Sequence, residues 1–159
     1  MILEIIYAFI VSLGFGVLFN VRGRNLFYAA SGGALGWLCY MITIKLSASP
    51  MLATFLASVT LSIYSEIFSR ILKNPVTLFL ICALIPLVPG SGMYYTVLEA
   101  VQGNVMESLN RGIETLSLAG LIALGIILVS TLSRLIQRLL YLKKERDFKK
   151  EHNLKKNNA

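Results

Sequence analysis

The residues best suited to binding chemistry lie in one short segment rich in proline and glycine. Pro86 and Pro89 lack backbone N–H donors, and the glycines at 90 and 92 allow backbone angles that no helix continues. A helix that restarts after this break has free N–H groups in its first turn, and Ser91 is placed to cap them. Such a helix start favours an anion. We therefore expect a path for a small anionic solute, lined by Pro86, Pro89, Gly90, Ser91, Tyr94 and Tyr95.

The same segment also has a simpler interpretation. An apolar helix from Pro75 to Val88 reaches about 21 Å at the helical rise, which is short of the roughly 30 Å hydrocarbon core of a bilayer. Broken backbone at membrane depth is tolerated only inside protein or beside a wet cavity, which favours a transport site. Proline and glycine can equally end a span at the membrane surface, and the sequence leaves both interpretations open.

A second pair of residues can carry charge chemistry. Glu66 and Arg70 lie four apart on an apolar helix with the acid first, the favourable order for a helical ion pair. An ionisable residue within a span suggests a function, here gating or proton coupling. A satisfied pair at the cytoplasmic boundary, next to Lys73, is the alternative.

These residues must be positioned by membrane-spanning helices. Apolar residues make up 56% of the chain and charged residues 14%, and the mean hydropathy is +0.71, more apolar surface than a soluble domain of this length can bury. We predict an all-α polytopic membrane protein with about five transmembrane helices in residues 1–142. The expected spans are 2–19, 26–44, 51–71, 75–101 (broken near 86–92) and 116–140. Gly32 and Gly36 form a small face for close helix contact in the second span.

The charge distribution predicts the orientation. From Arg134 onward there are nine basic and three acidic residues, a net of +6 out of the total of +7. Together with Arg22, Arg24, Arg70 and Lys73, these bases define one cytoplasmic side, so the amino terminus lies outside and the carboxyl terminus inside. Residues 143–159 form a basic cytoplasmic tail that attracts anionic lipid, and from about Asp147 its polar composition predicts disorder.

Several classes of function find no support in the sequence. The single histidine, His152, lies in the polar tail, and no cluster of metal ligands, paired acids or nucleophile motif is present. Cys39 and Cys82 lie in apolar runs and are expected as small core residues. We therefore expect no enzyme activity and no cofactor. A basic tail that follows a membrane span does not indicate nucleic-acid binding.

Two stretches of the chain resemble one family of membrane transporters. Arg70-Ile-Leu-Lys-Asn-Pro75 followed by Ile85-Pro86-Leu-Val-Pro89-Gly90-Ser91 and Tyr94 is similar to the threonine/serine exporter family of bacterial inner-membrane transporters. Phe19-Asn20-Val21 before the glycine-rich second span is similar as well. The chain departs from the family at Val21-Arg22-Gly23-Arg24, where the resemblance implies a proline after Asn20-Val21.

The resemblance implies a partner and a substrate class. It covers roughly residues 1–142 and matches the small five-span subunit of a split, two-chain exporter whose larger subunit carries the other five spans. It implies export of threonine and serine, or of a dicarboxylate such as succinate, across the bacterial inner membrane. An odd number of spans in so short a chain also suggests one half of something larger, a partner chain or a symmetric assembly.

Two alternatives to transport by a split exporter are open. The chain could be a membrane anchor or assembly subunit whose tail recruits another protein. It could also form a homo-oligomeric channel lined by hydroxyl groups, although such hydroxyls more often bond to their own helix backbone. The candidate lining residues are Ser58, Thr60, Ser62 and Ser65.

Overall fold

The computed structural model describes residues 2–46 and 49–157, and these residues form helices joined by short connections. The helices are α1 (Ile2–Leu18), α2 (Arg24–Lys45), α3 (Pro50–Leu72), α4 (Val76–Leu84), the 3₁₀ helix η1 (Ile85–Leu87), α5 (Gly90–Val101) and α6 (Val105–Asn157). No strand occurs among the described residues, so the predicted all-α fold is confirmed.

Helix length and composition identify three or four candidate membrane spans. In the described part of the chain, α2, α3 and the Val105–Lys143 part of α6 are long and apolar enough to cross a membrane, and the bent pair α4–η1 and α5 can count as a fourth span. The apolar helix α1 has 17 residues and extends about 26 Å, somewhat less than the hydrocarbon core. The protein is thus polytopic, while five remains a prediction.

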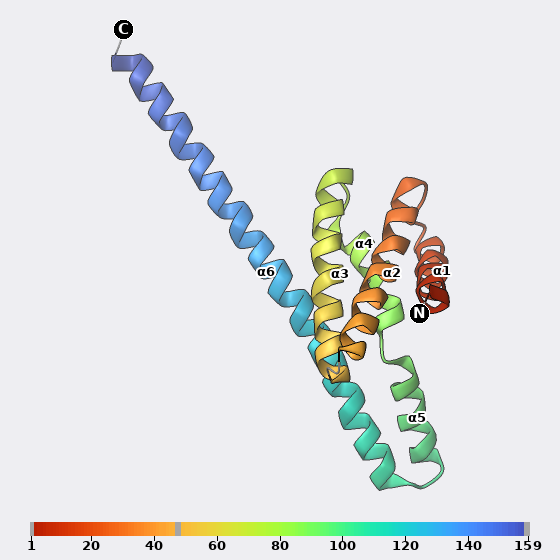
Figure 1. Cartoon of the computed structure of the whole chain (residues 1–159). Coiled ribbons are helices and arrows are strands. Elements are labelled where there is room, and N and C mark those ends of the chain that lie inside the picture. Colours follow the sequence, from red (N-terminus) through yellow and green to blue (C-terminus); the bar gives the residue numbers. More distant parts are fainter. Residues whose placement is uncertain (1, 47–48, 158–159) are drawn as a thin grey trace.

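Helices α1 to α4 form a bundle whose closest contacts involve glycine (Figure 1). Gly32, Gly33 and Gly36 are buried on one side of α2. A Cβ atom added to Gly32 would lie 3.0 Å from the Tyr64 ring, and one on Gly36 would lie 3.2 Å from Leu61. The predicted close packing through Gly32 and Gly36 is confirmed, because a side chain at either position would press against Tyr64 or Leu61 of α3.

The interior of the bundle is made of two groups of apolar side chains. One joins α3, α4, η1 and α6 and consists of Ala57, Leu61, Ala83, Leu87 and Ile122. The other joins α4 to the turn between α1 and α2 and consists of Val21, Ala29, Phe79 and Cys82. Because both groups include residues of α4, this short helix is held inside the bundle before the chain breaks.

Helix α6 runs in the same direction as α3 but is inclined to it, and it extends beyond α3 at both ends (Figure 1). Ser133 bonds to Glu66 across a sequence separation of 67, and a Cβ on Gly125 would meet the Ser58 side chain at the same separation. Extending this register places the residues of α6 before about Ser117 beyond the first turn of α3. Together with α5, this first part of α6 forms a hairpin, residues 90–116, that projects past the end of the bundle.

The carboxyl-terminal end of α6 differs from the prediction of disorder from Asp147. The helix continues to Asn157, whereas the polar composition from Asp147 predicts disorder. Lysine and glutamate are good helix formers, and adding residues to an existing helix avoids the cost of nucleation.

Candidate functional site

The predicted break in the fourth span is present and has a defined geometry. α4 ends at Leu84, η1 adds a 3₁₀ turn around Pro86, and Val88 is extended before α5 starts at Gly90. The helices on the two sides differ in direction by 53°. This bend arises because prolines at 86 and 89 cannot donate the backbone hydrogen bonds that a continuous helix needs.

The expected cap of the restarted helix is wrong in detail. Pro89, not Ser91, occupies the N-cap of α5, and no side chain caps this end. The N–H of Gly90 donates to the carbonyl of Val88 (2.7 Å) and that of Met93 to the carbonyl of Pro89 (3.2 Å). Ser91 therefore lies within the first turn of α5, where the helix geometry leaves its own N–H without an intrahelical acceptor.

α5 packs against α6 and against no other described helix. A Cβ on Gly92 would meet the Thr115 side chain, and Ser108 Oγ donates to the carbonyl of Thr96 (2.8 Å). α6 is uncharged from Thr115 to Ser133, about 28 Å at the helical rise, close to the hydrocarbon thickness. Gly92 thus lies level with one end of this uncharged segment.

Four of the predicted path residues, Gly90, Ser91, Tyr94 and Tyr95, are exposed on this hairpin, whereas Pro86 and Pro89 are half-buried in the break. Tyr94 is 63% exposed and Tyr95 46% exposed, and their rings make an edge-to-face contact. The guanidinium of Arg111 lies 5.6 Å from the centre of the Tyr95 ring and pairs with Glu107 at 2.9 Å. None of the residues of α5 is buried, so within this chain the hairpin presents its tyrosines outward.

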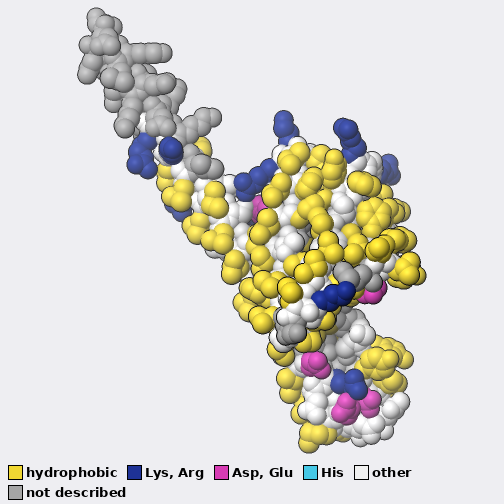
Figure 2. Space-filling model, in the orientation of Figure 1, with side chains coloured by type: hydrophobic (Ala, Val, Ile, Leu, Met, Phe, Trp, Pro, Cys, Tyr) yellow, Lys and Arg dark blue, Asp and Glu magenta, His cyan; other side chains and the backbone are white. Residues whose placement is uncertain are grey.

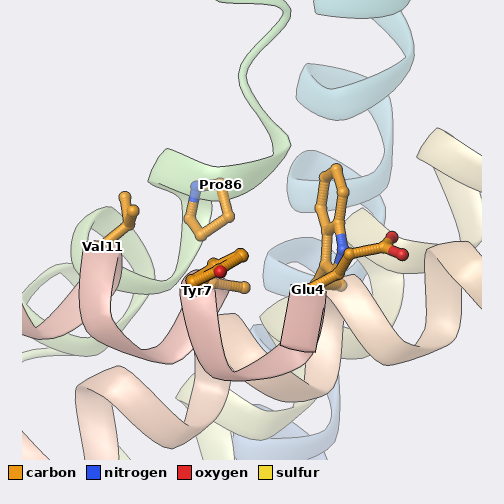
Figure 3. A pocket seen from close by; sticks show the side chains of 6 residues that line it. Glu4, Tyr7, Val11 and Pro86 are labelled. Atoms are coloured by element: carbon orange, nitrogen blue, oxygen red, sulfur yellow. The ribbon is translucent and has the colours of Figure 1, made fainter. Parts of the chain in front are cut away.

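A pocket of about 240 Å³ lies beside the break, between α1, α2 and η1. In Figure 3, Pro86 projects from η1 towards Tyr7 of α1, and Glu4 lies one turn before Tyr7. Trp37 of α2 also lines the pocket, and its ring stacks on that of Tyr40 with the ring centroids 5.2 Å apart. Pro86 is the predicted path residue that lines this pocket.

Two buried polar atoms near this pocket have no hydrogen-bond partner among the residues that the structure describes. They are the indole N–H of Trp37 and the hydroxyl of Ser12. Ser12 is fully buried one turn after Ala8, a lining residue. A buried unpaired donor is costly, so this region can accept a hydrogen-bonding group.

Glu66 and Arg70 form part of a three-residue cluster between α3 and α6. Ser133 Oγ donates to Glu66 Oε2 (2.7 Å), and Arg70 Nη2 donates to Ser133 Oγ (2.6 Å). The predicted ion pair between Glu66 and Arg70 is present with N and O 3.4 Å apart. Glu66 is largely covered, with 14% of its side chain exposed, while Arg70 is 47% exposed.

The structure brings together some of the predicted residues and separates others. Glu66 and Arg70 line a groove between α3 and α6 that shares no lining residue with the pocket at Pro86. Ser133 was missed because no pattern in the sequence links it to Glu66. Glu4 could have been found, since it is the sole charge in the first apolar run and such residues suggest function.

The hydroxyls proposed as channel lining point to their own helix. Ser58, Ser62 and Ser65 donate to carbonyls of Phe55, Ser58 and Leu61, and all three are buried. Thr60 likewise donates to the carbonyl of Leu56. This arrangement does not favour a channel lined by these residues.

An all-α, multi-pass membrane protein with a helix pair broken at Pro86–Gly90 is the class that this fold and site define. The sequence profile of the threonine/serine exporter family (ThrE) matches residues 4–132. The chain therefore belongs to the threonine/serine exporter family, and the expectation from its motifs is confirmed.

A relative from Haemophilus influenzae (strain ATCC 51907 / DSM 11121 / KW20 / Rd), described as an uncharacterized protein, is 30% identical over 100 residues. The match covers 62% of this chain and 33% of the relative, so the chain spans about a third of the relative's length. No solved structure matches the chain.

Proposed function

We propose that this chain is one subunit of a secondary exporter for small carboxylate-bearing metabolites. The substrate is threonine or serine, or a dicarboxylate such as succinate. The subunit acts with a larger membrane subunit of the same family in the bacterial inner membrane. Its amino terminus lies outside and its carboxyl terminus in the cytoplasm.

The observation that carries this proposal is the broken helix pair in a chain that belongs to an exporter family. Discontinuous helices are the common way in which transporters present free backbone groups to a substrate. Here the break is bent by 53°, and the helix that follows it contacts only α6 among the described helices. The other side of α5 is open to a second subunit, which would enclose the path.

The break offers two kinds of binding group for a carboxylate. The first-turn N–H group of Ser91 lies at the positive end of α5, and the hydroxyls of Tyr94 and Tyr95 add hydrogen-bond donors. Pro86 and Pro89 hold the bend in place. A carboxylate occurs in both amino acids and dicarboxylates, so one site can serve either substrate.

Glu66 and Arg70 act as a gate or proton-coupling element in this proposal. The supporting feature is that Glu66 is mostly covered and lies between two donors, Ser133 and Arg70. Protonation of its carboxylate would weaken the attraction to Arg70 and loosen the contact between α3 and α6.

Gly90→Leu tests the path. A Cβ on Gly90 meets nothing within 4 Å, so the variant should insert into the membrane and fold. Its leucine side chain should then obstruct the proposed substrate path beside the break. We expect substrate efflux to fall strongly. Gly120→Leu, also in open space, is the matched control and should export normally. Wild-type efflux by Gly90→Leu at normal membrane abundance would disprove the path.

Glu66→Gln tests the coupling role separately. The amide keeps the size of the side chain and removes its titration, so the pH dependence of efflux should flatten. An unchanged pH profile would remove Glu66 from proton coupling and leave the path hypothesis untouched.

Metabolite accumulation in cells tests the two-subunit arrangement and the alternative of a non-transport anchor. Cells that lack this chain, the larger subunit or both should accumulate the same carboxylates to the same extent. An anchor or assembly role predicts no accumulation when this chain alone is absent.

A further inference from the structure

A groove between α3 and α6 has the chemistry of a lipid site. Its walls are apolar, its volume is about 440 Å³, and one end carries Glu66, Arg70 and Ser133. We call it the α3–α6 groove. Its main apolar wall residues are Val59, Ile63, Ile67, Leu128, Leu132 and Ile136. In Figure 1, α6 diverges from α3 towards this end of the bundle.

We propose that the α3–α6 groove binds one anionic phospholipid, with an acyl chain along the apolar walls and the phosphate at Arg70. The groove shares no lining residue with the pocket at Pro86, but its polar end contains Glu66 and Arg70, to which the proposed function assigns gating or proton coupling. Basic pockets between transmembrane helices are known recognition sites for anionic headgroups.

The length of the groove favours a lipid over a transmembrane helix. From Val59 to Arg70 the groove follows α3 for about 16 Å at the helical rise, which is close to half of the roughly 30 Å hydrocarbon core. A lipid tail occupies one leaflet, while a partner helix would need a groove that crosses both. A single polar end next to apolar walls also matches a molecule with one charged head.

Arg70 has unused donors at the mouth of the groove. Its hydrogen bonds within the described residues all use Nη2, which donates to Ser133 Oγ and Glu66 Oε2. The Nε and Nη1 groups have no hydrogen-bond partner among the described residues, and 47% of the side chain is exposed. A guanidinium presents paired N–H groups that match phosphate oxygens.

The charge at this end of the bundle suits an anionic headgroup. Lys73 follows Arg70 at the end of α3, and Arg134 follows Ser133 on α6; both side chains are exposed. Lys and Arg side chains gather at this end in Figure 2. Glu66 is the acid in the cluster, and its carboxylate is already engaged by Ser133 and Arg70.

The experiment measures lipid retained by the full chain. The protein is incorporated into vesicles of phosphatidylcholine with 20% phosphatidylglycerol, about one lipid in five, an anionic fraction chosen to resemble a cytoplasmic leaflet. It is then extracted in mild detergent, and native mass spectrometry counts bound phosphatidylglycerol and phosphatidylcholine. We expect one retained phosphatidylglycerol per chain.

Leu128→Trp should block the groove. Leu128 lines it, while Ile127, the adjacent residue of α6, does not, although both are exposed. Leu128→Trp should lower retained phosphatidylglycerol about tenfold, as expected where a bulky side chain overfills a packed site. Ile127→Trp is the matched control and should retain it. Equal retention by the two variants would overturn the proposal.

Arg70→Gln tests the headgroup contact against general surface charge. Its retention of phosphatidylglycerol should fall more than tenfold, while Arg134→Gln should cost no more than about fivefold, the effect of one surface base. Arg70→Lys, which keeps the charge without the planar fork, should be intermediate. Equal losses for Arg70→Gln and Arg134→Gln would overturn the site.

Two further outcomes would also reject a lipid in the groove. One is equal retention of phosphatidylcholine by the wild-type protein, which would show no headgroup recognition. The other is a Leu128→Trp variant that keeps its lipid and loses association with the larger subunit or with a second copy. That result would make the groove a protein-docking surface. Circular dichroism and gel filtration check that each variant is folded.

Discussion

At the scale of single residues, contacts between helices depend on side chains with little or no volume. Gly33 of α2 lies against Ser12 of α1, and a Cβ at Gly33 would come within 2.9 Å of Ser12 Cβ and 3.4 Å of the Ala83 carbonyl. Neither of those atoms lies at the end of a flexible side chain, so the helices would have to move apart.

Gly33→Ala should therefore destabilise the bundle by about 1–3 kcal/mol, the usual cost of overpacking. Gly120→Ala in α6 is the control, because a Cβ there meets nothing within 4 Å and alanine improves helix stability by about 0.5–1 kcal/mol. Unfolding in increasing SDS, followed by circular dichroism, measures both. A Gly33→Ala variant as stable as the control would contradict the close contact.

Ser133 is a second residue whose effect depends on contacts made by folding. It is buried and joins Glu66 to Arg70 across two helices. Ser133→Ala should cost about 1–3 kcal/mol in the same SDS assay, since it leaves a covered carboxylate short of a donor.

Ser117→Ala is the matched control for that substitution. Ser117 is half-buried and donates to the carbonyl of Ile113 in its own helix. Its replacement breaks no hydrogen bond between helices and should change the stability by no more than about 0.5 kcal/mol. If the two alanine variants were equally stable, the Glu66–Ser133–Arg70 cluster would not contribute to the packing of α3 on α6.

At the scale of elements, the hairpin of α5 and the start of α6 is the part least supported by the rest of the chain. Its contacts run between its own two helices, through Gly92 with Thr115 and through Thr96 with Gly112 and Ser108. The hairpin also exposes many apolar side chains: Met93, Tyr94, Val97, Val101, Met106, Leu109 and Ile113. Exposed apolar surface of this kind marks contact with lipid or with another protein.

A disulfide tests the hairpin directly. A Cβ at Gly112 would lie 3.3 Å from Thr96 Cγ2, so side chains at 96 and 112 touch and a pair of cysteines there is a candidate for a disulfide. In a chain with Cys39 and Cys82 replaced by alanine, Thr96→Cys/Gly112→Cys should oxidise within one chain, as measured by mass spectrometry.

Two glycine variants determine whether that disulfide depends on α5 packing. Gly92→Leu clashes with Thr115 and should slow oxidation about tenfold, given an overpacking cost of about 1–3 kcal/mol. Gly90→Leu points into open space and should leave the rate unchanged. Equal rates in both variants would mean that α5 does not pack on α6 as described.

At the scale of the whole molecule, charge and fold agree on two distinct ends. α2 starts, at Arg24, at the end of the bundle where α3 finishes, at Leu72. Arg134 lies at the same end, because the adjacent residue Ser133 bonds to Glu66 near the end of α3. The last turn of α2, which ends at Lys45, and the projecting hairpin lie at the other end (Figure 1). The bases thus collect at one face, as the positive-inside rule requires for the proposed orientation.

Cysteine labelling tests this orientation. In the background with Cys39 and Cys82 replaced by alanine, Gln102→Cys should react with a membrane-impermeant maleimide in intact cells, since it lies at the tip of the hairpin. Arg138→Cys should react only after the membrane is permeabilised. The reverse pattern would invert the topology and move the Glu66–Arg70 cluster to the outer side.

The sequence alone determined the class of the protein, the place of the break and the family. These follow from local properties: apolar composition favours membrane helices, and prolines at 86 and 89 remove backbone donors wherever they occur. The Pro/Gly motif and its spacing from Arg70 were enough to indicate the exporter family.

Only the tertiary structure decided what surrounds these residues. The N-cap of α5 is Pro89 and not the predicted Ser91. Pro86 lies in the same pocket as Glu4 and Trp37. Glu66 bonds to Ser133, which lies 67 residues further along the chain on α6. Such partners depend on how helices pack and on the register of α3 against α6. No local pattern encodes that register, because it results from many small contacts acting together.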